Sequence, residues 1–416
     1  MSILIKDVRS GNKHTHIYIE GERICELGKK RDADTVIDGR GLAAFPGFVN
    51  THTHLAMTLL RGYADDMALH EWLGEKIWPM ERRLTKDLVA WGSRFGMLEM
   101  IRTGTTTFVE MYFFAPTVAK AVKEMGLRAS ICEGFIDLGD QERRERSIKE
   151  TIAGVKAIRA LRCDRVSPSI GPHAIYTVSK EAWQWCAQYA RDEGLLLQYH
   201  LSETEKEVKD CRKAHGMRPA KYLDSIGVLG PRSIAAHGVW LDAAETALLA
   251  KRKVSISNNP DSNFKLGVGR LFPYAQVAHA KANLTIGTDG AASNNSLDMF
   301  SSMKLASLQA KLMNAPTAMD ARTTLECATL NGAKALGLDA GVIKPGKLAD
   351  LILVDLNDIS MLPLHDLASN MVYSARASCM HTTICNGQVL MEDRKVEGEK
   401  RIIEGFKKAA GRLVGG

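Results

Sequence analysis

The sequence predicts a (β/α)8 barrel, or TIM barrel, joined to a small composite β-sandwich domain that is built from both ends of the chain. Two observations lead to this prediction. Short apolar, β-rich runs alternate with helix-long stretches along the middle of the chain, and β-like runs with turn residues occur at both ends. We therefore expect residues 1–45 and 345–416 to form the β-domain, and residues 46–344 to form the barrel.

Both ends of the chain have a sequence pattern typical of antiparallel strands. Three short β-like runs open the chain, at residues 3–5, 16–19 and 23–27. Near the other end, residues 349–354 have the composition of a buried strand, and Asn386-Gly387 forms a hairpin-turn pair between two β-rich runs. The two ends are therefore expected to share one sheet.

The middle of the chain contains eight β-rich runs, at residues 45–50, 105–110, 129–135, 165–170, 195–200, 233–237, 253–257 and 283–287. Stretches rich in Ala, Leu, Lys and Glu between them predict helices, among them 86–102, 115–125, 148–161, 180–193 and 243–249. In such a barrel the reactive groups gather at the C-terminal ends of the strands. Functional residues are therefore expected there.

Composition and charge exclude several classes of function. The formal charge of +7 is spread along the chain without a basic block, which argues against a nucleic-acid partner. The eight cysteines form no C-x-x-C pair, so reduced thiols in a cytoplasmic protein are expected. The chain has no apolar run of membrane-spanning length and no export signal, so no membrane association is expected.

The sharpest local feature is Thr51-His52-Thr53-His54 at the end of the first run. Alternate residues that leave a strand point the same way, so His52 and His54 can bind one metal ion. Taken alone, such a motif more often marks two capping or surface histidines than a metal site. Residues at three later strand ends favour a metal site instead.

The fifth run ends in His200 with Glu203 three residues later, the sixth ends in His237, and Asp289 follows the eighth. All of these positions fall on one face of the predicted barrel, which indicates a metal site. His52, His54, His200 and Asp289 are the expected ligands of one divalent ion, with Zn²⁺ favoured over Fe²⁺ or Mn²⁺. No lysine ends the fourth run, where a carboxylated side chain would bridge two metals.

Metal-assisted hydrolysis needs an activated water, a base and an acid for the leaving group. We expect His237 to hold or polarise the attacking water, Asp289 to accept its proton, and Glu203 to carry that proton onward to the leaving group.

Four segments resemble the amidohydrolase superfamily in order and spacing. They are Pro-Gly-Phe-Val-Asn-Thr-His-Thr-His at 46–54, His-Leu-Ser-Glu-Thr at 200–204, Ala-His-Gly at 236–238 and Gly-Thr-Asp-Gly at 287–290. Residues 341–351 resemble the segment by which these enzymes re-enter their β-domain, so the resemblance covers essentially the whole chain. It implies a homo-oligomer, either a dimer or a tetramer.

Further motifs are similar to the deaminases of 5'-methylthioadenosine, S-adenosylhomocysteine and 5'-deoxyadenosine, and most similar to the 5'-deoxyadenosine deaminase type of methanogenic archaea. These motifs include Trp72-Leu73, residues 77–81, 171–176, 259–263 and 291–295. The resemblance implies a nucleoside substrate whose 6-amino group is released as ammonia, adenosine itself included, to leave the corresponding inosine. Glu203 would then pass its proton to a ring nitrogen and to departing ammonia.

The resemblance also assigns substrate contacts. It implies that Glu81 binds the ribose hydroxyls and that His173 contacts the nucleoside, in addition to Glu203 and Asp289. Alternatives remain: Glu81 as a surface partner of a neighbouring arginine, and His173 as a loop-ordering residue. Trp72 either stacks on the base, closes the site or belongs to the core.

One departure from the family concerns the 5' substituent. Several bacterial members carry an arginine near the end of the third strand that pairs with the carboxylate of S-adenosylhomocysteine, whereas this chain has Glu133 in that stretch. Glu133 is expected to repel a carboxylate, although Arg143, Arg144 or Arg146 could compensate. Small uncharged 5' substituents are therefore expected to be preferred, with S-adenosylhomocysteine tolerated.

Two rival hypotheses follow from the same pattern. The first is a guanine or cytosine deaminase, or an s-triazine amino- or chlorohydrolase, in which Glu81 and His173 would have no sugar to bind. The second is a catalytically silent scaffold, and the complete set of ligand and acid-base residues argues against it.

Overall fold

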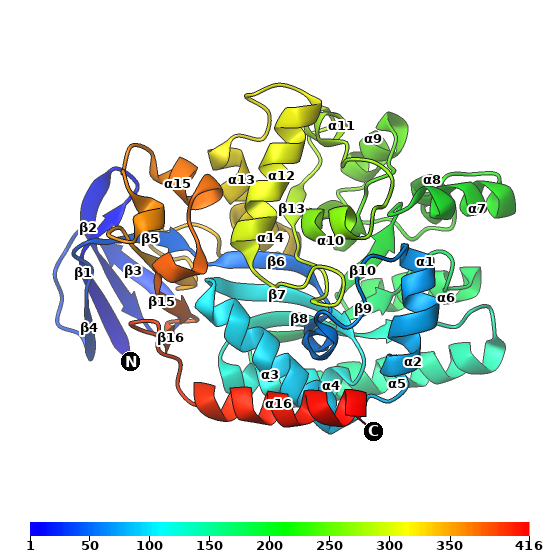
Figure 1. The fold of residues 1–416 in the computed structure, drawn as a ribbon, viewed down its shortest axis with the longest axis horizontal. Helices are drawn as coiled ribbons and strands as arrows, with labels where there is room; N and C mark the ends of the chain where they lie inside the picture. Colours follow the sequence, from blue (N-terminus) through cyan, green and yellow to red (C-terminus); the bar gives the residue numbers. More distant parts are fainter. Residues whose placement is uncertain (416) are drawn as a thin grey trace.

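The predicted barrel is present in the computed structural model, which describes residues 1–415 (Figure 1). Its eight strands are parallel and follow one another in chain order. They are β6 (Phe48–Thr53), β7 (Thr105–Tyr112), β8 (Arg128–Phe135), β9 (Val166–Pro172), β10 (Leu196–Leu201), β11 (Ser233–His237), β12 (Ser255–Asn258) and β13 (Leu284–Ile286). The first and last strands meet, because the hydroxyls of Thr51 and Thr285 lie 2.8 Å apart. The (β/α)8 class is therefore confirmed.

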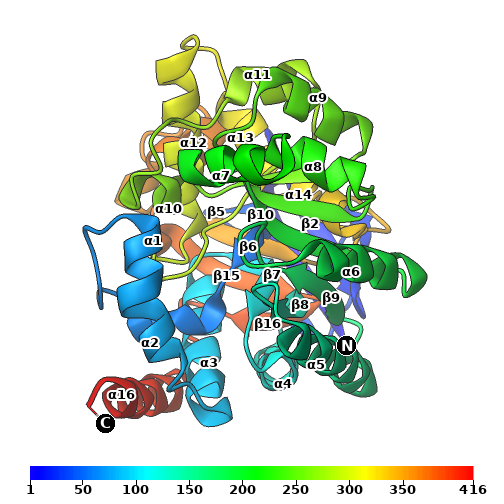
Figure 2. The ribbon, with the colours of Figure 1, turned by 90° about the vertical axis from the view of Figure 1, so that its right-hand side faces the viewer.

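Helices surround these strands (Figure 2). The main ones are α3 (Lys86–Arg102), α4 (Ala115–Met125), α5 (Gln141–Ala160), α6 (Lys180–Asp192), α7 (Glu205–His215), α8 (Pro219–Ser225), α9 (Ala243–Lys251), α10 (Pro260–Lys265), α11 (Tyr274–His279), α12 (Met299–Met313), α13 (Ala321–Ala328) and α14 (Leu330–Leu336). Between β6 and α3 the chain forms a 3-10 helix (Leu55–Leu60), α1 (Leu69–Glu71), a π-helix (Trp72–Ile77) and α2 (Trp78–Glu81).

Local capping explains where the helices begin and end. The predicted helices 86–102 and 115–125 are confirmed at both ends as α3 and α4. Gly126 ends α4 with a φ of 87°, a left-handed conformation that glycine adopts without steric cost. Helix α5 begins before the predicted start at residue 148, because the Asp140 side chain caps it by accepting a hydrogen bond from Arg143 N.

Both chain ends contribute to a second, mixed sheet, as the sequence predicts. Its strands are β1 (Ser2–Ser10), β2 (Lys13–Glu20), β3 (Arg23–Leu27), β4 (Thr35–Asp38), β5 (Leu42–Pro46), β14 (Leu351–Asp355), β15 (Met380–Cys385) and β16 (Gln388–Met391). The N-terminal and C-terminal parts join where β5 pairs antiparallel with β14. The predicted Asn386-Gly387 turn connects β15 to β16, with both residues at positive φ.

The first predicted barrel strand, residues 45–50, is divided between the two sheets. Strand β5 ends at Pro46 in the terminal sheet, and β6 begins at Phe48 in the barrel. The chain changes sheet at Gly47, where a Cβ atom would lie 2.3 Å from the Thr106 side chain. The correction moves His52 from the loop after the strand into β6 itself.

After β14 the chain contains α15 (Leu367–Tyr373), flanked by short 3-10 helices (Ile359–Met361 and Ala377–Cys379), and it ends in α16 (Glu399–Gly415). Helix α16 lies along α3 of the barrel (Figure 1), where the rings of Phe95 and Phe406 stack with centroids 3.8 Å apart. Among the helices of residues 1–415, none is long and apolar enough to cross a membrane.

Candidate metal centre and active site

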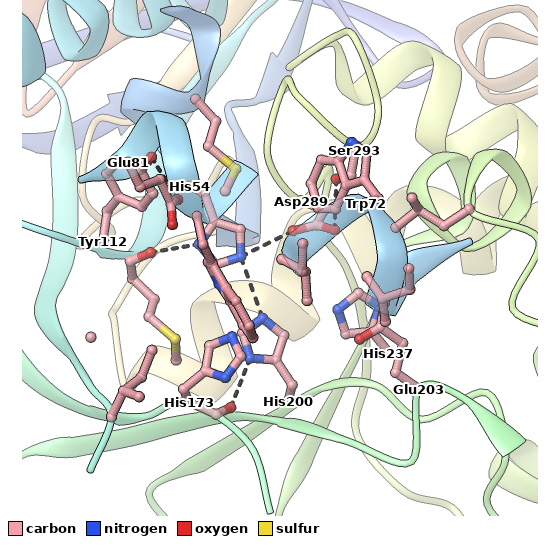
Figure 3. Close-up of a pocket in the computed structure, with 18 of the residues that line it drawn as sticks. His54, Trp72, Glu81, Tyr112, His173, His200, Glu203, His237, Asp289 and Ser293 are labelled. Atoms are coloured by element: carbon pink, nitrogen blue, oxygen red, sulfur yellow. Dashed lines mark hydrogen bonds and ion pairs between the residues drawn. The ribbon is translucent and has the colours of Figure 1, made fainter. Parts of the chain in front are cut away.

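The four predicted metal ligands converge at the C-terminal ends of the barrel strands. His52 belongs to β6, His54 follows it, His200 lies in β10, and Asp289 follows β13. His54 Nε2 lies 3.3 Å from His200 Nε2 and 3.2 Å from Asp289 Oδ1, and His52 Nε2 lies 3.5 Å from the same oxygen. Figure 3 shows His54, His200 and Asp289 turned toward one another.

The hydrogen bonds of the histidines direct their Nε2 atoms to one point. His54 Nδ1 lies 2.5 Å from the Met111 carbonyl oxygen, and His200 Nδ1 lies 2.7 Å from the His173 carbonyl oxygen. A carbonyl oxygen can only accept, so both Nδ1 atoms carry the hydrogen. His52 is 1% exposed, and its Nε2 has no hydrogen-bond partner within residues 1–415.

The electrostatics of this cluster suit a cation. Burial lowers the pKa of His52 to about 4, which keeps that imidazole neutral. Burial would also lower the pKa of His54, but the adjacent Asp289 carboxylate outweighs it and raises that pKa to about 9. Asp289 therefore attracts positive charge to the point where the imidazole nitrogens converge. Three imidazoles and one carboxylate in this arrangement fit a divalent metal ion.

Asp289 is oriented by two hydroxyl groups. Ser262 Oγ donates to Asp289 Oδ2 at 2.6 Å, and Ser293 Oγ donates to the same oxygen at 2.9 Å. This leaves Oδ1 to face His52 and His54. Sequence reasoning placed both serines in family-like motifs but gave them no role.

His237 lies beside the predicted ligands and is held by Asn263. His237 Nδ1 lies 2.9 Å from Asn263 Oδ1, whereas Asn263 Nδ2 donates to Asn258 Oδ1 at 3.3 Å. These bonds make His237 Nδ1 the donor and leave its Nε2 free. Ligand-type atoms of His52, His237 and Asp289 all lie within 4.8 Å of one another. His237 is therefore close enough to act on a water at the metal centre or to be a ligand itself.

Glu203 is a buried carboxylate next to His237, with Oε1 lying 3.7 Å from His237 Nδ1. Burial raises the pKa of Glu203, which makes its carboxyl group hold a proton more readily than an exposed glutamate does. The backbone is fixed there by Glu207, whose two carboxylate oxygens accept from Ser202 N and Glu203 N at 2.8 Å each.

Sequence reasoning also missed Glu110, which is fully buried near the end of β7. Its carboxylate accepts from Thr53 Oγ1 at 2.5 Å and from Leu55 N at 2.8 Å, and thereby clamps the chain on both sides of His54. Burial raises the pKa of Glu110 to about 7. Its position at the end of the second predicted run is the signal that could have identified it.

One cavity brings the metal centre and the predicted substrate contacts together (Figure 3). Its lining includes every predicted site residue except His52, which lies behind the others: His54, Trp72, Glu81, His173, His200, Glu203, His237 and Asp289.

Glu81, His173 and Trp72 each have a structural partner at this cavity. Glu81 Oε1 accepts from Tyr112 Oη at 2.9 Å, and His173 Nδ1 lies 2.8 Å from Thr177 Oγ1. The Trp72 indole donates to a backbone carbonyl oxygen and is 4% exposed, so this residue both packs in the core and lines the cavity.

Glu133 lies near the end of β8, the third barrel strand, and has partners that the sequence argument did not anticipate. Its carboxylate accepts from Phe114 N and Ala115 N at 2.8 Å each, at the N-terminus of α4. Two backbone donors and the positive end of the helix compensate its charge. Glu133 therefore does not line the cavity of the metal centre, but it does line a neighbouring cavity, so its effect on a substrate carboxylate stays a prediction.

A second cavity adjoins the first and shares four lining residues with it: Trp78, Glu81, Phe113 and Ile136. Of the three arginines considered for the 5' substituent, Arg143 lines this second cavity and the other two do not. The Arg144 guanidinium instead lies 3.9 Å from both Asp137 and Glu181.

The chain is similar to known proteins over nearly its whole length. The model of the amidohydrolase family matches residues 43–390. The chain is 52% identical to the 5'-deoxyadenosine deaminase of Methanoregula boonei, over 99% of this chain and 95% of the relative. It is 45% identical to the 5-methylthioadenosine/S-adenosylhomocysteine deaminase 1 of Archaeoglobus fulgidus, over 99% of both chains.

Among solved structures, the chain resembles an adenosine deaminase from Xanthomonas campestris crystallised with bound zinc. The TM-score is 0.93 at 32% identity, covering 99% of this chain and 98% of the other. The matched family model, the full-length relatives and the shared fold lead to one conclusion: the chain belongs to the amidohydrolase family.

Proposed function

We propose that this protein is a hydrolytic deaminase that converts 5'-modified adenosines to the corresponding inosines and ammonia. The substrates we assign are 5'-deoxyadenosine, 5'-methylthioadenosine and S-adenosylhomocysteine, with adenosine as a further one. The observation that carries the proposal is the single cavity in which a metal-ligand cluster, the buried acid Glu203 and the carboxylate of Glu81 face one another. The names of the relatives support the same class of substrate.

The proposed cofactor is one Zn²⁺ ion, held by His52, His54, His200 and Asp289. Three imidazoles and one carboxylate match the preference of zinc for nitrogen and oxygen ligands. A divalent ion in this place supplies Lewis acidity, which lowers the pKa of water toward neutrality.

The protein's own groups would carry the protons of the reaction. Asp289 accepts a proton from the attacking water, and the free Nε2 of His237 holds that water for attack on C6 of the purine. Glu203 donates its proton to the neighbouring ring nitrogen, takes up the remaining proton of the attacking hydroxyl as the C6=O bond forms, and passes it to the leaving amino group. The proton on Asp289 then returns to Glu203, so both carboxyl groups end as they began. In the net reaction a C6–O bond forms, the C6–N bond breaks and ammonia leaves, so one water is consumed.

The remaining cavity residues would position the nucleoside. Glu81 is a partly buried acceptor suited to the ribose hydroxyls, and His173 offers a ring nitrogen to the nucleoside beside His200. Trp72 supplies an apolar wall at the base. A free base such as guanine or cytosine, or a triazine, would cover Glu81 without supplying its sugar partner, which disfavours those substrates energetically.

The second cavity would accept larger 5' substituents. It begins at Glu81, where the sugar would lie, and contains the guanidinium-bearing Arg143. Glu133 also lines this cavity, but two backbone donors at the N-terminus of α4 compensate its charge, so an amino-acid carboxylate at this place would be attracted by Arg143. S-adenosylhomocysteine is therefore a full substrate in this proposal.

Isotope labelling tests the reaction. Zinc-loaded protein with 5'-deoxyadenosine in H₂¹⁸O is expected to release ammonia and 5'-deoxyinosine in equal amounts, with ¹⁸O at C6 of the product. Absence of turnover, or a product without the label, would overturn the proposal.

A further inference from the structure

The cavity contains a polar contact that the reaction scheme above does not use. Tyr112, the last residue of β7, donates its hydroxyl to Glu81 Oε1 at 2.9 Å, and both residues line the cavity (Figure 3). Glu81 comes from α2, in the connection between β6 and α3. The hydrogen bond therefore ties the side chain of a connecting segment to the rigid end of a barrel strand.

The contact leaves one side of the Glu81 carboxylate available. Oε1 is engaged by Tyr112, and Oε2 has no hydrogen-bond partner within residues 1–415. Two carboxylate oxygens have about four acceptor positions, so a single donor leaves room for two hydroxyl groups. Fixing one oxygen also fixes the plane of the carboxylate and hence the direction of the other.

The Tyr112 hydroxyl stabilises a Glu81 carboxylate that is partly removed from water. Glu81 is partly buried, and the desolvation of its carboxyl group raises the pKa, whereas the Tyr112 hydroxyl acts in the opposite direction. A buried carboxylate without a donor loses both its charge and its preferred orientation. Tyr112 itself is 4% exposed, so its hydroxyl has no ready alternative in bulk water.

The same strand end also reaches the metal centre. The backbone carbonyl of Met111, next to Tyr112, holds His54 Nδ1 at 2.5 Å. One residue of β7 thus orients a metal ligand through its backbone, and the next orients Glu81 through its side chain. Because the two contacts use different groups, removing the Tyr112 hydroxyl leaves the contact to His54 in place.

We propose that Tyr112 is a positioning residue that sets the specificity for ribose, by holding Glu81 in the orientation that receives the 2'- and 3'-hydroxyls of the nucleoside. The inference rests on the proposed nucleoside deaminase function. It predicts that loss of the Tyr112 hydroxyl lowers kcat/KM only for substrates that carry those two ribose hydroxyls.

The test compares Tyr112→Phe with the unmodified protein on two substrates, 5'-deoxyadenosine and its 2',3'-dideoxy analogue. Loss of a hydrogen bond to a charged group is expected to lower kcat/KM for 5'-deoxyadenosine about tenfold, mainly through KM. The value for the dideoxy analogue is expected to change less than about twofold, because that substrate offers Glu81 no hydroxyl.

Two further variants sharpen the comparison. In a Glu81→Ala background, Tyr112→Phe is expected to have no further effect on 5'-deoxyadenosine, because the group it positions is gone. Tyr176→Phe removes another hydroxyl from the lining of the same cavity, without a contact to Glu81, and is the matched control. It is expected to leave the ratio between the two substrates unchanged.

Metal content and thermal midpoint are measured on every variant, and both are expected to match those of the unmodified protein. A Tyr112→Phe protein that loses activity equally on both substrates, loses its metal, or loses nothing would overturn the inference while leaving the deaminase proposal intact. An unmodified protein that turns over neither nucleoside would overturn the proposed function, and this inference with it.

Discussion

Ser262 donates a hydrogen bond to Asp289 Oδ2 at 2.6 Å, on the side of the carboxylate that faces away from the histidines. The next residue, Asn263, contacts His237. One short helix, α10, therefore orients two of the groups to which we assign proton transfer. Such supporting hydrogen bonds fix the geometry of a metal site and the basicity of its ligands.

Replacing Ser262 by Ala is expected to weaken zinc binding about tenfold to a hundredfold and to lower kcat, because Asp289 keeps a single hydroxyl donor. Competition with a chelator measures the affinity, and steady-state kinetics measure the rate. Ser301→Ala is the matched control, since Ser301 contacts the surface carboxylate of Asp261. If both variants bind zinc as tightly as the unmodified protein, the assigned role of Ser262 is wrong.

Removal of the metal is expected to abolish deamination. Dialysis against a chelator should give inactive protein, and addition of about one equivalent of Zn²⁺ per chain should restore activity. His200→Ala should bind zinc far more weakly because one imidazole is missing. Full activity of the metal-free protein, or a requirement for two ions per chain, would contradict the proposed centre.

Replacing Glu203 by Gln is expected to reduce kcat by about a hundredfold or more, with little change in KM, because the amide cannot carry the proton. Glu205→Gln is a suitable control on the same segment, because Glu205 is a surface residue paired with Lys209. Near-normal turnover by the Glu203 variant would remove Glu203 from the mechanism.

Replacing Arg143 by Ala is expected to lower kcat/KM for S-adenosylhomocysteine about tenfold and to leave 5'-deoxyadenosine unaffected, because only the former carries a carboxylate. Arg146→Ala, on the same helix but outside the second cavity, is the control. An equal effect of both variants, or a loss with 5'-deoxyadenosine as well, would argue against a role for Arg143 in substrate recognition.

The cluster of candidate metal ligands was predictable because each of its members is marked by its local sequence. His52, His54, His200 and Asp289 each stand at the end of a β-rich run, and barrel topology alone brings such ends together. The helices α3 and α4 were predictable for the same reason, since their lengths and ends are encoded in neighbouring residues.

The supporting residues were not predictable because their partners lie far away along the chain. Glu110 acts on the segment around His54, and Ser262 acts on Asp289, so neither role is visible within one segment. The division of the first predicted strand depends on how closely Gly47 approaches Thr106, which is likewise a long-range fit. The partners of Glu133 were not predictable either, because they are backbone groups at the start of α4.

The most direct test of the central claim is a substrate panel on zinc-loaded protein, in which ammonia release is measured as kcat/KM. The panel contains 5'-deoxyadenosine, 5'-methylthioadenosine, S-adenosylhomocysteine, adenosine, guanine and cytosine. We predict that the 5'-modified adenosines exceed guanine and cytosine by at least about a hundredfold, because the free bases leave Glu81 without a sugar hydroxyl. Turnover of guanine or cytosine with none of the nucleosides would keep the barrel and the metal centre but contradict the assignment of the substrate.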